Sequence, residues 1–209
     1  MDPAQANEQL RVIRSLMERA TIYRAISAPT ALVGGLLSLI ASVVGPDGDA
    51  RRFVVGWLLV LVLTLAANTW FIRQKAKREG GKIFSSGLRL AIRAALPVLL
   101  VTAALTASLW GNDGGQGVAL LMATVWTLGY GLALLSTATF APGSLVVFGW
   151  IYLATGLLAR PIVYQNLSHS ISHPASLLMG LSFGGYHLVY AVCTWPRKHA
   201  AEAAQTSIE

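Results

Sequence analysis

The chain has 209 residues, of which 55% are hydrophobic and only 12% are charged. Soluble domains carry about 25% charged residues, so this composition excludes an ordinary water-soluble globular protein and predicts an integral membrane protein. The apolar runs are continuous rather than alternating, which favours membrane-spanning helices over the strands of a β-barrel. The net charge of +7 is attributed to basic residues on the cytoplasmic side of a membrane protein, not to nucleic-acid binding.

Residues 1–27 are predicted to form a cytoplasmic amphipathic helix. Apolar side chains recur there at steps of three and four, and most basic residues fall off that stripe. The stripe consists of Leu10, Ile13, Met17, Ala20 and Tyr23. Such a helix lies in the membrane interface, packs beneath the bundle or binds a cytoplasmic protein. No cleavable signal peptide is expected, because the following apolar run is too long.

Six apolar segments follow, and each is predicted to cross the bilayer as a helix. The fold class is therefore an all-α six-transmembrane-helix bundle, preceded by the amphipathic helix. The expected spans cover about residues 28–45, 53–72, 88–110, 118–140, 144–160 and 175–196. Residues 197–209 are expected to form a short polar cytoplasmic tail.

The basic residues predict the orientation of these spans. With six spans both termini share one side of the membrane, and 13 of the 16 Lys and Arg residues fall on that side. The opposite side holds only Arg51, Arg52 and Arg160. The positive-inside rule therefore places both termini in the cytoplasm.

The last span carries the main candidate for function, His187, which is predicted to lie slightly past the bilayer midplane. A titratable side chain at this depth is costly and usually marks a functional site. Tyr186 and Tyr190 flank it, so a His–Tyr group is a candidate to relay protons or line a polar cavity. The alternative is a neutral histidine that hydrogen-bonds a neighbouring span and stabilises packing. Asn68 is a further candidate, either as a pore residue or as a bridge between helices.

Basic residues gather at the cytoplasmic ends of the second and third spans. They are predicted to hold an anionic lipid or another anionic ligand, and the simplest alternative is that they snorkel to the headgroups. The group consists of Arg73, Lys75, Lys77, Arg78, Lys82, Arg89 and Arg93.

Small residues predict where helices pack closely. Gly180 and Gly184 form a small-xxx-small pattern in the last span, and Gly34 and Gly35 lie in the first span. Such residues let helix backbones approach one another. The partner is either another helix of the chain or a second copy in a homo-oligomer.

Metal and catalytic motifs are weak. His169 and His173 have the i, i+4 spacing that binds a divalent metal on a helix, but Pro174 and nearby serines favour a loop. The single Cys193 excludes an internal disulfide. No Asp or Glu falls within a predicted span, and neither HExxH nor a P-loop occurs. No cofactor is identified.

Two stretches are similar to a known group of proteins. Residues 18–29, ERATIYRAISAP, and residues 178–190, LMGLSFGGYHLVY, resemble uncharacterised multi-spanning bacterial inner-membrane proteins. The resemblance implies a multi-pass protein of the bacterial inner membrane. It implies no activity and no catalytic residue.

Three functions are compatible with these features. The first is a conduit or transporter for a small solute or ion, with His187 and its tyrosines along the path. The second is a non-catalytic sensor or regulatory partner that binds a cytoplasmic protein. The third is a membrane enzyme that handles a lipid or cofactor. A conduit predicts a water-accessible channel or cavity that reaches His187. A sensor predicts a tightly packed bundle and an exposed apolar stripe on residues 10–26. An enzyme predicts a pocket with a bound metal, haem or lipid.

Overall fold

The computed structural model describes Gln9 and residues 28–45, 49–79, 86–111, 115–162 and 173–195. The elements found in these ranges are helices joined by turns, with no strand among them. The expected amphipathic helix over residues 1–27, apart from Gln9, and the expected tail over residues 197–209 lie outside the described residues.

The described helices follow one another along the chain with short connections. They are α2 (Ala28–Val44), α3 (Ala50–Glu79), α4 (Ser86–Leu109), α5 (Gly115–Leu135) and α6 (Gly143–Ile162). A last helix is built from α7 (Pro174–Met179), the π-helix η2 (Gly180–Tyr186) and α8 (His187–Thr194). We call this continuous helix, Pro174–Thr194, the C-terminal span.

Four helices are long and apolar enough to cross a membrane. They are Ala50–Gln74, Leu88–Leu109, Gly115–Leu135 and Pro174–Thr194. Ala28–Val44 and Gly143–Ala159 are apolar but shorter. The structure therefore supports a helical membrane protein and four of the six predicted spans by length and composition.

Two of the predicted helix ends differ most from the structure. The helix predicted over 53–72 continues to Glu79, because the following Lys and Arg residues are good helix formers. The helix predicted over 118–140 ends at Leu135. The hydroxyls of Ser136 and Thr137 donate to the carbonyls of Ala133 and Leu134, and such local bonds compete with the helix ladder.

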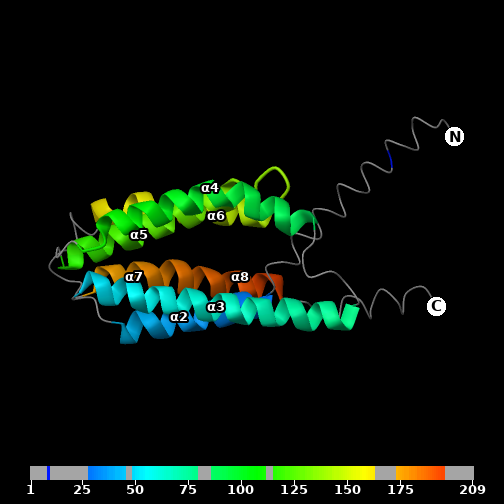
Figure 1. Ribbon diagram of the computed structural model, residues 1–209, viewed down its shortest axis with the longest axis horizontal. Helices are drawn as coiled ribbons and strands as arrows, with labels where there is room; N and C mark the ends of the chain where they lie inside the picture. Colours follow the sequence, from blue (N-terminus) through cyan, green and yellow to red (C-terminus); the bar gives the residue numbers. More distant parts are fainter. Residues whose placement is uncertain are drawn as a thin grey trace.

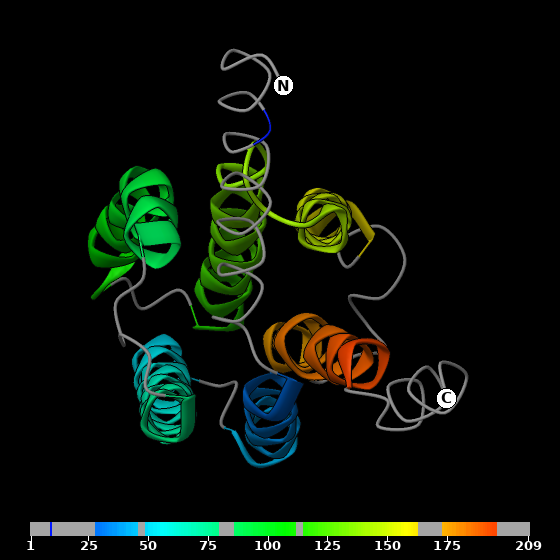
Figure 2. The ribbon, with the colours of Figure 1, turned by 90° about the vertical axis from the view of Figure 1, so that its right-hand side faces the viewer.

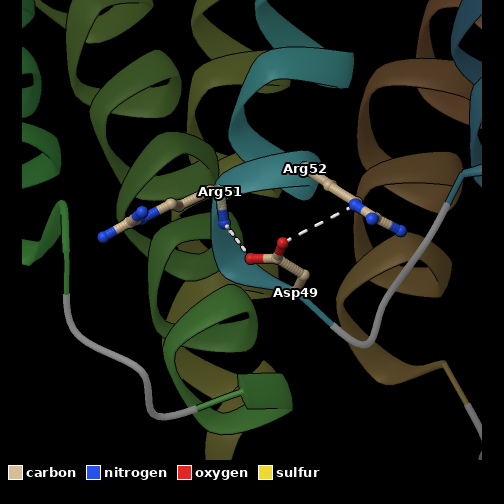
Figure 3. Close-up of polar contacts among 3 residues, drawn as sticks. All are labelled: Asp49, Arg51 and Arg52. Atoms are coloured by element: carbon tan, nitrogen blue, oxygen red, sulfur yellow. Dashed lines mark hydrogen bonds and ion pairs between the residues drawn. The ribbon is translucent and has the colours of Figure 1, made fainter.

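The start of α3 is fixed by Asp49 (Figure 3). The backbone N–H of Arg51 donates to Oδ1 of Asp49 at 2.9 Å, which satisfies one of the free donors of a helix N-terminus. The Nε of Arg52 lies 3.7 Å from Oδ2 of Asp49. Both side chains of this ion pair are exposed, so the pair contributes little to stability and Asp49 acts chiefly as a cap.

The helices pack in two layers. One layer holds α4, α5 and α6, and the other holds α2, α3 and the C-terminal span (Figure 1), as the end view also shows (Figure 2). Successive helices run in opposite directions (Figure 1). We call the end of the bundle where α2 begins and the C-terminal span ends the Thr194 end, and the opposite end, where α3 begins, the Asp49 end.

Glycines of α2 meet both of its neighbours in the layer. A Cβ added at Gly34 would lie 2.9 Å from Cγ2 of Thr64 on α3. A Cβ added at Gly35 would lie 2.9 Å from Cδ2 of Leu188 on α8. The absence of side chains at these two positions lets α2 fit between α3 and the C-terminal span.

The glycines of the C-terminal span face α2 in return. A Cβ at Gly184 would lie 2.7 Å from Cδ2 of Leu39, and one at Gly180 would lie 2.6 Å from Oγ of Ser42. Gly180, Gly184, Gly34 and Gly35 thus all lie at contacts between helices of one chain.

The buried side chains form two apolar groups at different heights in the bundle. The larger group includes Phe53, Trp57, Met122 and Leu178 and lies toward the Asp49 end. The smaller group lies toward the Thr194 end and consists of Ala31, Leu145, Tyr190 and Ala191. The level between the two groups is where His187 lies.

The outer faces of α3 and α4 are apolar and exposed. They carry many uncovered large side chains, among them Leu59, Val62, Leu100 and Val101. None of the 18 residues in the most apolar window of α4 is buried by protein. An apolar surface of this extent requires lipid or another apolar partner.

Candidate functional site

The imidazole of His187 lies between two tyrosine hydroxyls that come from different helices. The hydroxyl of Tyr152, on α6, lies 3.0 Å from Nδ1. The hydroxyl of Tyr130, on α5, lies 3.3 Å from Nε2. Both ring nitrogens therefore have a polar neighbour inside the bundle, and three helices meet at this residue.

The hydrogen bonds of this group have a defined direction. The hydroxyl of Tyr152 donates its single proton to the carbonyl oxygen of Ser182 at 2.7 Å, since a carbonyl can only accept. Tyr152 must then accept from His187, which places a proton on Nδ1. In the neutral ring Nε2 is left as the acceptor for the hydroxyl of Tyr130. The chain runs from Tyr130 through His187 and Tyr152 to Ser182.

Aromatic rings enclose this hydrogen-bonded chain. Phe183 stacks on the imidazole of His187, with centroids 6.1 Å apart and planes at 20°. Tyr130 and Tyr152 meet edge to face at 4.8 Å, and Phe183 packs against both of them. Packing of this kind restricts the rotamers of the rings, so the imidazole has a fixed orientation.

The π-helix η2 places Ser182 and Phe183 in this site. At the end of η2 the backbone N–H of His187 bonds to the carbonyl of Gly184, three residues earlier, which is a 3₁₀-type bond. In a regular α-helix it would bond to the carbonyl of Phe183. A π-helical turn changes the backbone ladder and is frequent at functional sites. Here the turn presents the Ser182 carbonyl to Tyr152 while Phe183 reaches the ring of His187.

A small cavity of about 20 Å³ reaches His187. This volume is enough for one water molecule. Its lining comes from α5, α6 and α8, and consists of Tyr130, Leu134, Leu145, Phe148, Tyr152, His187 and Tyr190. The other lining residues of α5 and α6 lie closer to the Thr194 end than Tyr130 and Tyr152 do. They are Leu134, Leu145 and Phe148. The cavity therefore approaches His187 from that end of the bundle.

The two tyrosines that the sequence placed beside His187 have other contacts. Tyr186 bonds to the hydroxyl of Thr155 at 2.7 Å. Because Thr155 donates its own proton to the carbonyl of Ile151, Tyr186 is the donor. Tyr190 is buried, lines the cavity and packs edge to face on Phe148 at 5.3 Å.

Asn68 belongs to a different part of the bundle. It lies on α3, where its side-chain oxygen accepts a hydrogen bond of 3.1 Å from the hydroxyl of Thr30 on α2. The hydrogen-bonded chain at His187 is built from α5, α6 and the C-terminal span. The structure thus places Asn68 as a bridge between α2 and α3 and does not bring it into that chain.

Comparison with known proteins adds no further assignment. No protein-family model, curated protein or solved structure matches this chain. The function is therefore argued from the geometry at His187 and from the arrangement of the helices.

The described members of the predicted anion-binding group lie at one end of the bundle. Arg73 and Lys77 are exposed near the end of α3, and Arg89 and Arg93 are exposed near the start of α4, at the Thr194 end. Two more positions of this group, Lys75 and Arg78, lie on α3, but their side chains are outside the described residues, as is the whole of Lys82.

The histidine pair proposed from sequence as a weak metal site is not brought together in the described part of the chain. His169 lies outside the described residues. His173 is exposed just before α7, and its carbonyl accepts from the N–H of Leu177 at 3.0 Å. Within the described ranges no group of three or more His, Cys, Asp or Glu side chains is placed to hold a metal ion.

Sequence reasoning found His187 but missed its two hydrogen-bond partners. Tyr130 and Tyr152 lie 57 and 35 residues from His187 along the chain, so no local pattern links them. A signal was present, because tyrosines in spanning helices concentrate near the ends. Tyr130 and Tyr152 both fall within apolar segments, and Tyr130 stands between Gly129 and Gly131.

Proposed function

We propose that this protein is a six-span membrane protein that conducts protons, or a small polar solute together with protons, past His187. The observation that carries the proposal is the pair of tyrosine hydroxyls, 3.0 and 3.3 Å from the two ring nitrogens. The imidazole of histidine can accept and release a proton, so it is suited to this role. The cavity, which has room for about one water molecule, reaches the same ring.

The six-span arrangement is supported by how the shorter helices pack. α2 has 17 residues, which is close to the lower limit of about 17 for a spanning helix. α6 has 20 residues. Both run alongside the four longer helices and connect the same two ends (Figure 1). With six antiparallel spans, the N-terminus and the C-terminus lie on the same side of the membrane.

The orientation and the membrane follow from charge and resemblance. The Thr194 end carries Arg73, Lys77, Arg89 and Arg93, so the positive-inside rule places it in the cytoplasm. Exposed cations there would contact anionic lipid headgroups of the inner leaflet. The resemblance to bacterial proteins supports the inner membrane as the location.

The observed conformation is the closed form of such a conduit. The cavity has room for about one water molecule, and the polar chain ends at the carbonyl of Ser182. Below it, toward the Asp49 end, the larger apolar group of buried side chains fills the bundle. Passage would require Tyr152 and the C-terminal span to separate.

Proton flux tests the proposal. The purified protein is reconstituted into liposomes that contain a pH-sensitive dye, and a pH step is applied with valinomycin and K⁺ present to dissipate the membrane potential. We expect the internal pH to relax faster than in protein-free liposomes of the same lipid. Relaxation no faster than in protein-free liposomes, for pH steps in both directions, would contradict the conduit.

The hydrogen-bonded chain ends at the carbonyl of Ser182, and this also favours a second candidate function. That candidate is a membrane-embedded sensor or regulatory partner. A polar chain that is reached from the Thr194 end and ends at Ser182 fits a group that gains a proton without passing it on. A sensor predicts protonation of His187 with no flux. The flux measurement, made beside a spectroscopic titration of His187, separates the two functions.

Cysteine labelling is expected to confirm the orientation. In a Cys193→Ser background, Gly143→Cys probes the Thr194 end and Trp110→Cys probes the Asp49 end. Both positions are exposed, and an added Cβ at Gly143 meets no atom within 4 Å. An impermeant maleimide should label Trp110→Cys in intact spheroplasts and Gly143→Cys only after lysis. The reverse pattern would overturn the assigned orientation.

A further inference from the structure

The hydroxyl of Tyr152 lies between a ring nitrogen of His187 and a backbone carbonyl. Its hydroxyl has one proton and two polar neighbours, the carbonyl of Ser182 at 2.7 Å and Nδ1 of His187 at 3.0 Å. The carbonyl accepts and never donates, so the tyrosine proton points to Ser182. Nδ1 fills the remaining position only as a donor.

We propose that Tyr152 and the Ser182 carbonyl hold neutral His187 as its Nδ1–H tautomer, so that Nε2, beside Tyr130 and the cavity, is the atom that takes up a proton. Tyr152 is a positioning residue in this scheme, because it acts on the proton through the orientation of the ring. The role of Nε2 as the loading atom rests on the proposed function, whereas the tautomer does not.

The surroundings of the ring contain few groups that exchange protons. Besides His187, the titratable side chains at the site among the described residues are Tyr130, Tyr152, Tyr186 and Tyr190. The sequence of α2, which packs on the C-terminal span, holds none. With Nδ1 already bonded to Tyr152, Nε2 is the basic atom on the cavity side.

Proton uptake at Nε2 leaves the rest of the chain in place. A hydronium ion in the cavity gives its proton to Nε2, one O–H bond breaks, one N–H bond forms, and a water molecule remains. Tyr130 then accepts from Nε2–H, and its own proton turns toward the cavity. The bonds from Nδ1 to Tyr152 and from Tyr152 to Ser182 keep their direction. Loading therefore requires one hydroxyl to rotate.

Nitrogen NMR of the histidine side chains tests the tautomer directly. The protein is labelled with ¹⁵N-histidine in lipid vesicles, and the signal of His187 is identified by its loss in His187→Gln. At a pH where the ring is neutral, we expect the wild type to show protonated Nδ1 and unprotonated Nε2. A wild-type spectrum of the Nε2–H tautomer would overturn the inference without any variant.

Two tyrosine variants then identify the cause. Tyr152→Phe removes the hydroxyl that accepts from Nδ1–H but leaves the backbone carbonyls of Phe183 and Ser182 beside the ring. The share of the Nε2–H form, which Tyr130 satisfies by accepting, should therefore rise relative to the wild type. Tyr186→Phe removes a hydroxyl that bonds to Thr155 and should leave the tautomer unchanged. An unaltered tautomer in folded Tyr152→Phe would contradict the positioning role.

The outcome is independent of transport. The spectra are recorded without a gradient, so absence of flux together with the Nδ1–H tautomer refutes the conduit and leaves this inference intact. Flux together with the Nε2–H tautomer would refute this inference and leave the conduit intact.

Discussion

Replacing His187 by Gln is expected to lower proton flux through reconstituted protein by about a hundredfold or more, the scale on which a positioned acid–base group contributes to proton transfer. The amide of Gln offers a donor and an acceptor of similar reach, so it can still bond to Tyr130 or Tyr152. It does not titrate near neutral pH. The variant therefore removes proton exchange while the bundle keeps its packing.

The matched control is His173→Gln. His173 is exposed immediately before the C-terminal span, and it carries the same ring outside the hydrogen-bonded chain. Its replacement should leave flux unchanged. Both variants are compared at equal reconstituted amounts after size-exclusion chromatography shows the wild-type elution profile. Wild-type flux in folded His187→Gln would remove this residue from the path.

From the sequence, only those site residues that lie on a single helix could be predicted. The position of His187 within an apolar run identified it, because a titratable residue at that depth is costly. Its neighbours on the same helix, Tyr186 and Tyr190, were the natural partners to name. The structure instead uses Tyr130 and Tyr152. Helical periodicity gives the face of a single helix and contains no information about which residues of other helices meet that face.

The helices themselves were easier to predict than their ends. A bilayer sets a length of about 20 apolar residues for a spanning helix, and that length is visible in the sequence. Helix ends depend on smaller energies. The end of α5 at Leu135 follows from hydroxyl-to-carbonyl bonds at Ser136 and Thr137. The π-helix over Gly180–Tyr186 had no signal beyond its glycines, since it depends on contacts with α2 and α6.

A substitution at Gly131 is expected to affect both helix packing and proton flux. Gly131 lies on α5 next to Tyr130. Its backbone faces α6, and a Cβ added there would lie 2.9 Å from the carbonyl oxygen of Gly149 and 2.9 Å from the backbone nitrogen of Leu153. It would also lie 3.0 Å from Cβ of Tyr152. Two of these atoms are backbone atoms of a helix, so relief requires the whole of α6 to move.

Gly131→Ala is therefore expected to lower the free energy of unfolding by about 1–3 kcal/mol, the usual cost of overpacking a close contact. Because Tyr152 lies at the same contact, the variant should also weaken the bond between Tyr152 and His187 and reduce flux. Unfolding is followed by circular dichroism in mixed micelles as the fraction of denaturing detergent is raised.

Gly56→Ala is the control for this substitution. Gly56 lies in the second turn of α3 on its exposed face, and an added Cβ there meets no atom within 4 Å. A surface change of this kind alters stability by no more than about 0.5 kcal/mol, and alanine is the better helix former. Equal unfolding curves for the two variants would mean that α5 and α6 are not in backbone contact at Gly131. The placement of Tyr152 against His187 depends on that contact, so the same result would also undermine the site.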